Sequence, residues 1–328
     1  MKPTLLMNFQ RMALCMLIAF GMQTAQAQRF HNMAFPQDYQ PFTKDTLTVL
    51  SWNVEHFVDS FDNPYIRNRM EDRPRLDEIG KRIDFLTEVV RLSGADVVVL
   101  QEFESRSFAF DIAQKRLADL GFIHVAGSES PDWYMNVVIM SKLPMGLTYS
   151  YGNAYSPVIG FKDSLGRPET QRHINTRIAS AEIWVNDGFS FVLTGVHLKA
   201  GRYERDAAMR MGQIDLIKSQ QRRLLKEDKK TRLLLCGDFN LTPESPEMAR
   251  LKGPEAPQYL DLLEGKPVFS HPADTPARRI DHILMNKAME KSVVPGSVKP
   301  FVPKPGAEMR GLSDHLPMRA QFLVRKED

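Results

Sequence analysis

The chain has 328 residues, of which 43% are hydrophobic and 25% charged, with two cysteines and a formal net charge of +3. These proportions are those of an ordinary globular protein, and they exclude disordered, collagen-like and disulfide-rich proteins. Because 43 basic residues nearly balance 40 acidic ones, the composition argues against a polybasic arm, although it leaves a local basic groove open.

The first 27 residues have the pattern of a secretory signal peptide. Lys2 and Arg11 provide positive charge, Met12 to Met22 is an apolar run, and Ala25-Gln26-Ala27 matches a cleavage site. The run is short for a membrane span. We therefore expect cleavage, export to the periplasm or the medium and no stable membrane insertion, with an uncleaved N-terminal anchor as the alternative. Cleavage would leave 301 residues, a charge of +1 and Cys236 as the one cysteine, so no intramolecular disulfide could form.

Residues 28–44 are predicted to be an irregular lead-in, and residues 45–328 a single domain, because no repeat or linker interrupts them. Apolar residues recur every three or four positions from Leu76 to Val90 and from Tyr203 to Ile217, which predicts two helices. Short apolar runs predict strands at Leu47–Trp52, Asp96–Leu100, Asn136–Met140, Ile178–Val185, Ser190–Val196, Leu233–Cys236, Ile280–Met285 and Met318–Val324.

Some of these runs, such as residues 97–100 and 233–235, are apolar on both faces of the strand. This pattern predicts central strands that are covered on both sides in a layered α/β domain, and taken alone it indicates a parallel sheet.

Polar residues stand at six places along the chain where an apolar segment ends. They are Asn53, Glu102, His197 with Lys199, Asp238 with Asn240, Asp281, and Asp314 with His315. A buried strand that ends in an unpaired charge is costly, so six such ends predict one shared polar floor. Its many oxygen atoms suit a hard divalent cation, Mg²⁺ first with Mn²⁺ or Ca²⁺ as alternatives. Zinc is less favoured, because no paired His or Cys spacing is present.

The ordered series resembles the endonuclease/exonuclease/phosphatase superfamily over residues 47–324. The residues that carry the resemblance are Trp52-Asn53, Gln101-Glu102, His197-Leu198-Lys199, Gly237-Asp238-Phe239-Asn240, Ile280-Asp281-His282 and Ser313-Asp314-His315. The resemblance implies an α/β (α+β) fold like that of deoxyribonuclease I. That fold is a four-layered sandwich of two packed, mostly antiparallel sheets flanked by helices. It also implies a metal-dependent phosphoric ester hydrolase.

The resemblance further implies a role for each acidic or amide residue. Glu102 would be the principal metal ligand, with Asn53 and Asp314 beside it. Asp238 would orient or deprotonate the attacking water, and Asn240 would hold water or phosphate. The alternative for the last two is an Asx turn, for which Gly-Asp-x-Asn is well suited.

The histidines and basic residues receive roles in the same way. His315 would contact the phosphate or act as a general acid or base, and Asp281 would fix its tautomer and raise its pKa. His197 would protonate the leaving oxygen. Lys199, Asn136 and Arg177 are candidate substrate-binding residues, weighed against a solvated lysine and against structural roles. Five other histidines have no partner that the sequence reveals, so surface or packing positions are predicted for them: His56, His124, His173, His271 and His282.

Three functions remain in competition. The first is an exported nuclease or other phosphodiesterase, and the second a phosphomonoesterase acting on a sugar, inositol or lipid phosphate. The third is a non-catalytic binding module on the same fold, which the full set of metal and histidine positions disfavours. Residues 276–281 lack the Trp-Cys-Asp-Arg segment of inositol 5-phosphatases, and export favours scavenging over genome repair. We therefore expect a monomeric nuclease or phosphodiesterase, with the choice between DNA and RNA left open.

Overall fold

The computed structural model describes residues 42–68, 76–130, 133–149, 151, 154–303 and 309–324. Contacts divide the chain into Met1–Phe42 and Thr43–Asp328, and every element named below belongs to the second unit. The predicted signal peptide and nearly all of the predicted lead-in lie outside the described residues. Within those ranges, no helix combines the length and the apolar character that crossing a membrane would need.

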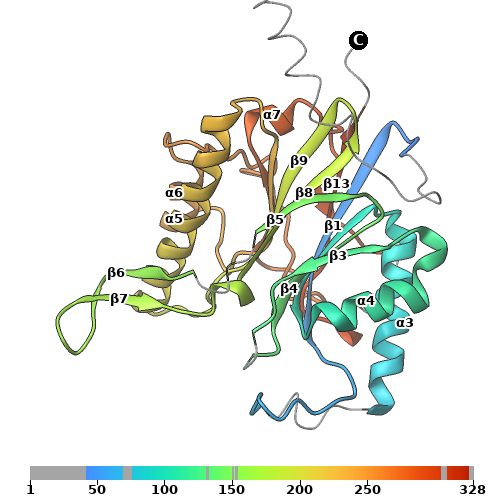
Figure 1. Cartoon of the computed structure of the whole chain (residues 1–328), viewed down its shortest axis with the longest axis horizontal. Coiled ribbons are helices and arrows are strands. Elements are labelled where there is room, and N and C mark those ends of the chain that lie inside the picture. Colours follow the sequence, from blue (N-terminus) through green and yellow to red (C-terminus); the bar gives the residue numbers. More distant parts are fainter. Residues whose placement is uncertain are drawn as a thin grey trace, which may run out of the picture. The chain divides into compact units, whose positions relative to one another are not determined.

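Two central sheets lie next to each other (Figure 1), with strand orders β12-β13-β1-β2-β4-β3 and β11-β10-β9-β8-β5. The first contains β1 (Thr46–Phe57), β2 (Val97–Phe103), β3 (His124–Gly127), β4 (Asn136–Ser141), β12 (Lys299–Pro300) and β13 (Met318–Leu323). The second contains β5 (Met145–Tyr149), β8 (Ile178–Asn186), β9 (Phe189–His197), β10 (Leu233–Asp238) and β11 (Asp281–Met285).

Most strand pairs are antiparallel, but the centre of each sheet is a parallel pair. β1 runs parallel to β2, and β9 runs parallel to β10. These four strands contain the apolar runs that, taken alone, indicated a parallel sheet. Their other neighbours pair antiparallel, as β13 does with β1 and β11 with β10. The prediction of mostly antiparallel sheets is therefore confirmed.

The two sheets pack face to face because alternate residues of the central strands point inward. A Cβ atom added to Gly195 of β9 would lie 2.5 Å from Cγ1 of Val99 and 2.9 Å from Cγ1 of Val137, both on the first sheet. The backbone of β9 thus touches side chains of the opposite sheet, and only glycine allows this separation.

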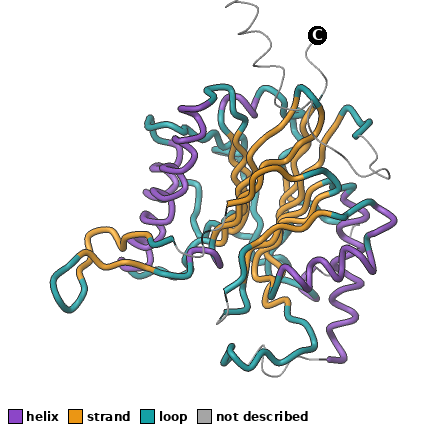
Figure 2. The backbone as a smooth tube through the Cα atoms, viewed as in Figure 1, coloured by secondary structure: helices purple, strands orange, loops and turns teal. Residues whose placement is uncertain are grey.

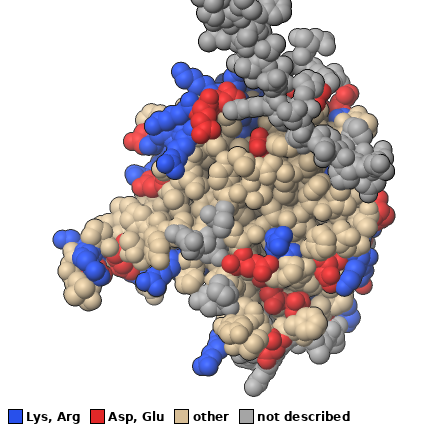
Figure 3. Space-filling model, viewed as in Figure 1, with Lys and Arg blue, Asp and Glu red and all other residues tan. Residues whose placement is uncertain are grey.

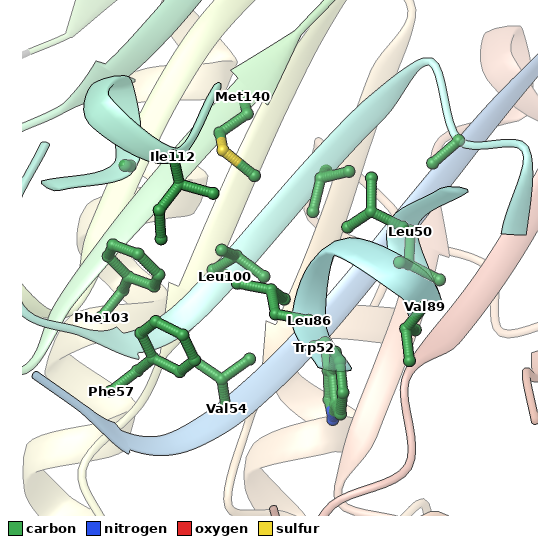
Figure 4. Packing of buried hydrophobic residues seen from close by; sticks show 14 of the residues in the cluster. Leu50, Trp52, Val54, Phe57, Leu86, Val89, Leu100, Phe103, Ile112 and Met140 are labelled. Carbon is green, nitrogen blue, oxygen red and sulfur yellow. The ribbon is translucent and has the colours of Figure 1, made fainter. Parts of the chain in front are cut away.

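Helices cover the two outer faces (Figures 1 and 2). On the first sheet, α3 (Leu76–Ser93) and α4 (Arg106–Arg116) pack against alternate residues of the strands, with Leu86 and Val89 beside Trp52 and Leu100 (Figure 4). On the second sheet, α5 (Glu204–Glu227) and α6 (Pro246–Lys252) close a separate apolar cluster. Helix, sheet, sheet and helix make four layers, as the resemblance implied.

All eight predicted strands and both predicted helices are present. The elements that the sequence did not predict are short and half-exposed, so they lack a continuous apolar signal. They are β3, β5, β12, α4, α6, α7 (Lys287–Glu290) and the hairpin of β6 (Ser156–Lys162) and β7 (Pro168–Gln171). The hairpin extends away from the sheets and packs against α5 (Figure 1).

Candidate active site

The polar ends of the central strands from both sheets meet at one edge of the sandwich. Asn53 in the second half of β1 contacts Asp238 at the end of β10, and Glu102 of β2 faces His197 of β9. Asp238 in turn is paired with Asp281 in the register of β10 and β11. We call the assembled set the polar cluster: Asn53, Glu102, His197, Asp238, Asn240, Asp281, Asp314 and His315.

Asn53 links the two sheets at the centre of the polar cluster. It is fully buried, and its Nδ2 donates to Oε1 of Glu102 at 3.2 Å and to Oδ2 of Asp238 at 3.1 Å. Its Oδ1 accepts the backbone N–H of Glu55 at 3.0 Å. In this arrangement the amide of Asn53 holds two carboxylates in place, and its carbonyl oxygen is used by the chain.

Glu102 is held by backbone as well as by side chains. Its Oε2 accepts the backbone N–H of His56 at 3.0 Å, and its own φ of +57° is left-handed. Burial raises the pKa of this carboxyl, but His197, His56 and the hydrogen bond from Asn53 act against burial, and the net pKa is lowered. Glu102 is therefore a carboxylate at neutral pH.

Asp238 and Asn240 form a tight turn after β10. Oδ1 of Asp238 accepts the backbone N–H of Asn240 at 2.8 Å, which is the Asx turn that the sequence suggested as an alternative. The same carboxylate faces the polar cluster, so the turn and the site coexist. Gly237 is required before it, because its φ is +141° and a Cβ would lie 2.0 Å from the carbonyl oxygen of Val196. Burial raises the pKa of Asp238 to about 7, with His315 opposing and Asp281 adding to the shift.

His315 is hydrogen-bonded by one ring nitrogen and faces the site with the other. Its Nδ1 lies 2.9 Å from Oδ2 of Asp281, which also accepts the hydroxyl of Ser270 at 2.6 Å. Its Nε2 lies 3.9 Å from Oδ2 of Asp238 and 3.7 Å from Oδ1 of Asp314. Burial alone would lower the pKa of His315, but Asp281 and Asp238 together raise it to about 10. The ring is therefore an imidazolium at neutral pH.

His197, unlike His315, is neutral at neutral pH. Its Nε2 lies 3.7 Å from both Oε1 of Glu102 and Oδ2 of Asp238, and its backbone N–H donates to the carbonyl of Arg177 at 2.8 Å. Burial lowers the pKa of His197 to about 4 although Glu102 opposes it. A neutral imidazole has no imidazolium proton to give, so His197 would have to gain a proton before protonating the leaving oxygen, and that role stays a prediction.

The three candidate substrate-binding residues lie at different places. The Nδ2 of Asn136 donates to the backbone carbonyl of Glu104 at 2.5 Å. The Nζ of Lys199 is paired with Oδ1 of Asp206 at 3.1 Å. The charges of Glu102 and Asp238 act on the pKa of Arg177, which burial lowers, so Arg177 lies near the polar cluster. The substrate-binding roles of all three residues stay predictions.

Two histidines for which the sequence revealed no partner lie against the polar cluster. Nε2 of His271 is 3.2 Å from Oδ2 of Asp314, and its ring lies 4.7 Å from that of His315. Nδ1 of His56 is 2.7 Å from the hydroxyl of Tyr134. His56 follows Asn53 on the same strand end, so the strand-end pattern could have included it, whereas no local signal marks His271.

His282 agrees with its predicted packing position. Its Nε2 lies 2.8 Å from the carbonyl oxygen of Leu241, and its ring meets Phe239 edge to face.

The donor chemistry of the polar cluster fits a hard divalent cation. Among the described residues, two groups of acidic and histidine side chains bring their ligand atoms within 4.8 Å of one another: Asp238-Asp281-His315 and His271-Asp314-His315. Both include His315, whose imidazolium form has no free nitrogen for a metal, and neither includes Glu102. The side chains of Glu102 and Asp314 are 15% and 30% exposed, whereas Asp238 is almost fully buried. Glu102 and Asp314 are thus the carboxylates that an ion from solvent could reach, and oxygen donors are those that Mg²⁺ prefers.

Comparison with known proteins supports this reading of the fold. The model of the Endonuclease/Exonuclease/phosphatase family matches residues 50–315. No curated protein matches the chain.

Several solved structures are similar in fold. D. rerio TDP2 complexed with single strand DNA product has 19% identity, with a TM-score of 0.56 over 86% of this chain and 100% of that chain. The human Nocturnin catalytic domain with bound sulfate anion has 15% identity and a TM-score of 0.58, over 85% and 94% of the two chains. An AP endonuclease from Archaeoglobus fulgidus has 17% identity and a TM-score of 0.52, over 85% and 100%. At these identities the likeness establishes the fold.

Proposed function

The chain belongs to the endonuclease/exonuclease/phosphatase family of phosphoester hydrolases, and from this premise we propose that it is an exported, divalent-metal-dependent nuclease or phosphodiesterase. The observation that carries the proposal is the array Asp281–His315–Asp238. One carboxylate holds an imidazolium, and that imidazolium faces a second carboxylate whose pKa is raised to about 7. An acid and a base that are both in their working forms near neutral pH suit hydrolysis of a phosphate ester.

Each group then has a defined task in the proposed reaction. Asp238 takes the proton of the attacking water at its carboxylate, and its raised pKa brings its basicity close to the working pH. His315 presents the N–H of Nε2 to a phosphoryl oxygen, while Asp281 keeps its Nδ1 protonated. Neutral His197 can give the departing oxygen a hydrogen bond, but not the proton of an imidazolium.

A bound Mg²⁺ would neutralise charge on the phosphoryl oxygens. Glu102 and Asp314 would hold it, with Asn53 fixing the orientation of Glu102. The number of buried carboxylates in the polar cluster supports this assignment, because a cation there would offset their negative charge.

Export is proposed from the N-terminal pattern alone. The N-terminus of protein secreted by an expressing bacterium should begin at Gln28. Retention of Met1 on membrane-bound protein would instead support the uncleaved anchor.

A substrate panel tests the activity. The mature protein is assayed on plasmid DNA, RNA, bis-p-nitrophenyl phosphate and p-nitrophenyl phosphate, with Mg²⁺ or Mn²⁺ and with chelator. We expect cleavage of diesters that chelator abolishes. Turnover in chelator would exclude the metal, and cleavage of the monoester alone would favour the phosphomonoesterase.

Two variants assign the activity to the site. Glu102→Ala and His315→Ala should each lower the rate by at least about 10²-fold, as expected for electrostatic and acid–base groups. His124→Gln is the matched control, because His124 lies on β3 outside the polar cluster. Near-normal activity of either site variant would refute its role.

A further inference from the structure

A second feature of the site is a cavity of about 290 Å³ that begins at Arg177 and Lys199. Arg177 joins it directly to the polar cluster, because its backbone carbonyl accepts the N–H of His197 at 2.8 Å. Lys199, which also lines the cavity, lies two residues after His197 in the chain. A molecule in this cavity would therefore lie next to a phosphate bound at the polar cluster.

Hydrogen bonds between three segments hold the cavity walls in place. Gln213 of α5 donates from Nε2 to Oε1 of Gln171 at 2.9 Å and accepts the backbone N–H of Lys199 at 3.0 Å. Gln171 at the end of β7 donates to the carbonyl of Met209 on α5 at 2.8 Å. The helix and the hairpin also approach closely, since a Cβ on Gly212 would lie 1.9 Å from the carbonyl oxygen of Pro157. The cavity is therefore preformed rather than a gap between independent loops.

The lining combines cationic groups with an aromatic ring. Arg177 is partly buried, and within the described part of the chain no hydrogen bond or ion pair of its guanidinium with a protein acceptor occurs. Arg172 lies on the same wall with its guanidinium near the ring of Tyr155. Trp133 contributes the aromatic surface, and its indole Nε1 is buried without a hydrogen-bond partner among the described residues.

The aromatic wall is also connected to Glu102. The ring of Trp133 lies 5.4 Å from that of Tyr134, whose hydroxyl is 2.7 Å from Nδ1 of His56. The backbone N–H of His56 donates to Glu102. A ligand that packs on Trp133 would thus be held in a fixed position relative to Glu102, the proposed metal ligand.

A ligand for this cavity must be aromatic and anionic. Guanidinium groups bind phosphate oxygens, and an indole ring stacks on a nucleobase. The volume lies at the lower limit for ligand pockets, so it admits a single nucleotide. The bases of an intact duplex are stacked inside it and cannot enter such a cavity.

We propose that this cavity binds the nucleotide next to the scissile phosphate of a single-stranded nucleic acid, with its base on Trp133 and its phosphate at Arg177 and Arg172. The proposal rests on the proposed function and specifies its substrate as single-stranded nucleic acid.

A larger cavity of about 590 Å³ between α5 and α6 provides an internal control. Lys and Arg side chains gather over the C-terminal part of α5 (Figure 3). The arginines of this cavity are ion-paired, Arg250 with Asp215 at 2.6 Å and Arg222 with Glu255 at 3.4 Å. Among the residues that the structure describes, none that lines this cavity is aromatic.

The test compares two single strands with the same backbone, one with bases and one with abasic sugars. Wild type should cleave the base-bearing strand with a kcat/KM higher on the order of 10-fold, as base–aromatic stacking predicts. Trp133→Ala should lose most of this preference, and Trp133→Phe should keep most of it. Arg172→Ala should raise KM for the base-bearing strand, whereas Arg222→Ala should not.

Binding is measured separately, so that the result does not depend on catalysis. Calorimetry should detect a nucleoside monophosphate on wild type, weaker binding of ribose 5-phosphate, and loss of the difference between them in Trp133→Ala. Melting temperatures identify a variant that fails to fold, in which case Trp133→Phe and the wild-type comparison of the two ligands decide.

The outcomes separate the two proposals. A wild type that cleaves neither strand refutes the nuclease function, and calorimetry still tests the cavity. A wild type that cleaves both strands equally, or a folded Trp133→Ala that keeps the preference for bases, refutes the cavity alone. Cleavage of duplex as fast as of single strand also refutes it.

Discussion

Replacing Asp281 by asparagine should move the basic limb of the enzyme's pH profile toward acid. Asp281 is buried, and its Oδ2 lies 2.9 Å from Nδ1 of His315. Asparagine has nearly the same size but no charge. Burial lowers the pKa of His315, and the charge of Asp281 that counteracts burial is absent in the variant. This pKa should therefore fall from about 10 toward or below its ordinary value of 6.5.

The loss of rate follows from this change. If the pKa of His315 returns to 6.5, about 3% of the rings remain protonated near pH 8, whereas nearly all are protonated in wild type. Protonation alone then lowers the rate about 30-fold at that pH. A less firmly held ring adds to the loss, for a total of roughly 10²- to 10⁴-fold. The deficit should shrink near pH 6, where most of the variant's rings are protonated again.

The acid limb should not follow the basic limb. The charge of Asp281 adds to the raised pKa of Asp238, which must lose its proton to act as a base, but His315 opposes that shift more strongly. When His315 becomes neutral its opposing effect is lost together with that of Asp281, so the acid limb has no reason to move toward acid.

The assay is kcat/KM on a phosphodiester from about pH 5 to about pH 10 with saturating Mg²⁺. Asp96→Asn is the matched control. Asp96 is equally buried and pairs with Lys44 at 2.7 Å and Lys142 at 3.4 Å, but it lies just before β2, at the end opposite Glu102. It should lower the melting temperature and leave the pH profile unchanged. An Asp281→Asn profile that is lower but not shifted would show that Asp281 does not set the charge of His315.

Three further predictions concern stability. Asp238→Asn should raise the melting temperature of the metal-free protein above about pH 7 and not below about pH 4. Because the pKa of Asp238 is raised in the folded protein, its contribution to folding stability is present at low pH and is lost as the pH rises toward 7, and asparagine avoids that loss. Equal melting temperatures of wild type and variant at every pH would contradict this. Mg²⁺ should raise the melting temperature of wild type but not of Glu102→Gln, and an equal rise in both would exclude Glu102 as a ligand. Gly195→Ala should destabilise by about 1–3 kcal/mol in denaturant melts because it pushes the sheets apart, and Val99→Ala should partly reverse the loss. No cost for Gly195→Ala would mean that the sheets can separate freely.

The strands that build the core could be predicted because their signal is local. β1, β2, β9 and β10 contain apolar runs that face protein on both sides, and the structure places them as the two central parallel pairs. Edge elements such as β5 and the β6–β7 hairpin escaped prediction because they are half-exposed. Their place depends on the neighbour that they pair with, and a local pattern does not contain that information.

For the site, the sequence by itself determined which strand ends carry acidic, amide and imidazole groups, because an apolar run that stops at a charge is visible in the residues alone. Only the tertiary structure decided which of these groups meet. It placed His271 against Asp314 across 43 residues of chain, and it engaged Lys199 with Asp206. It also made His197 neutral and His315 cationic. The physical reason is that the charge of a buried imidazole depends on burial and on carboxylates brought by distant strands, neither of which the spacing of residues records.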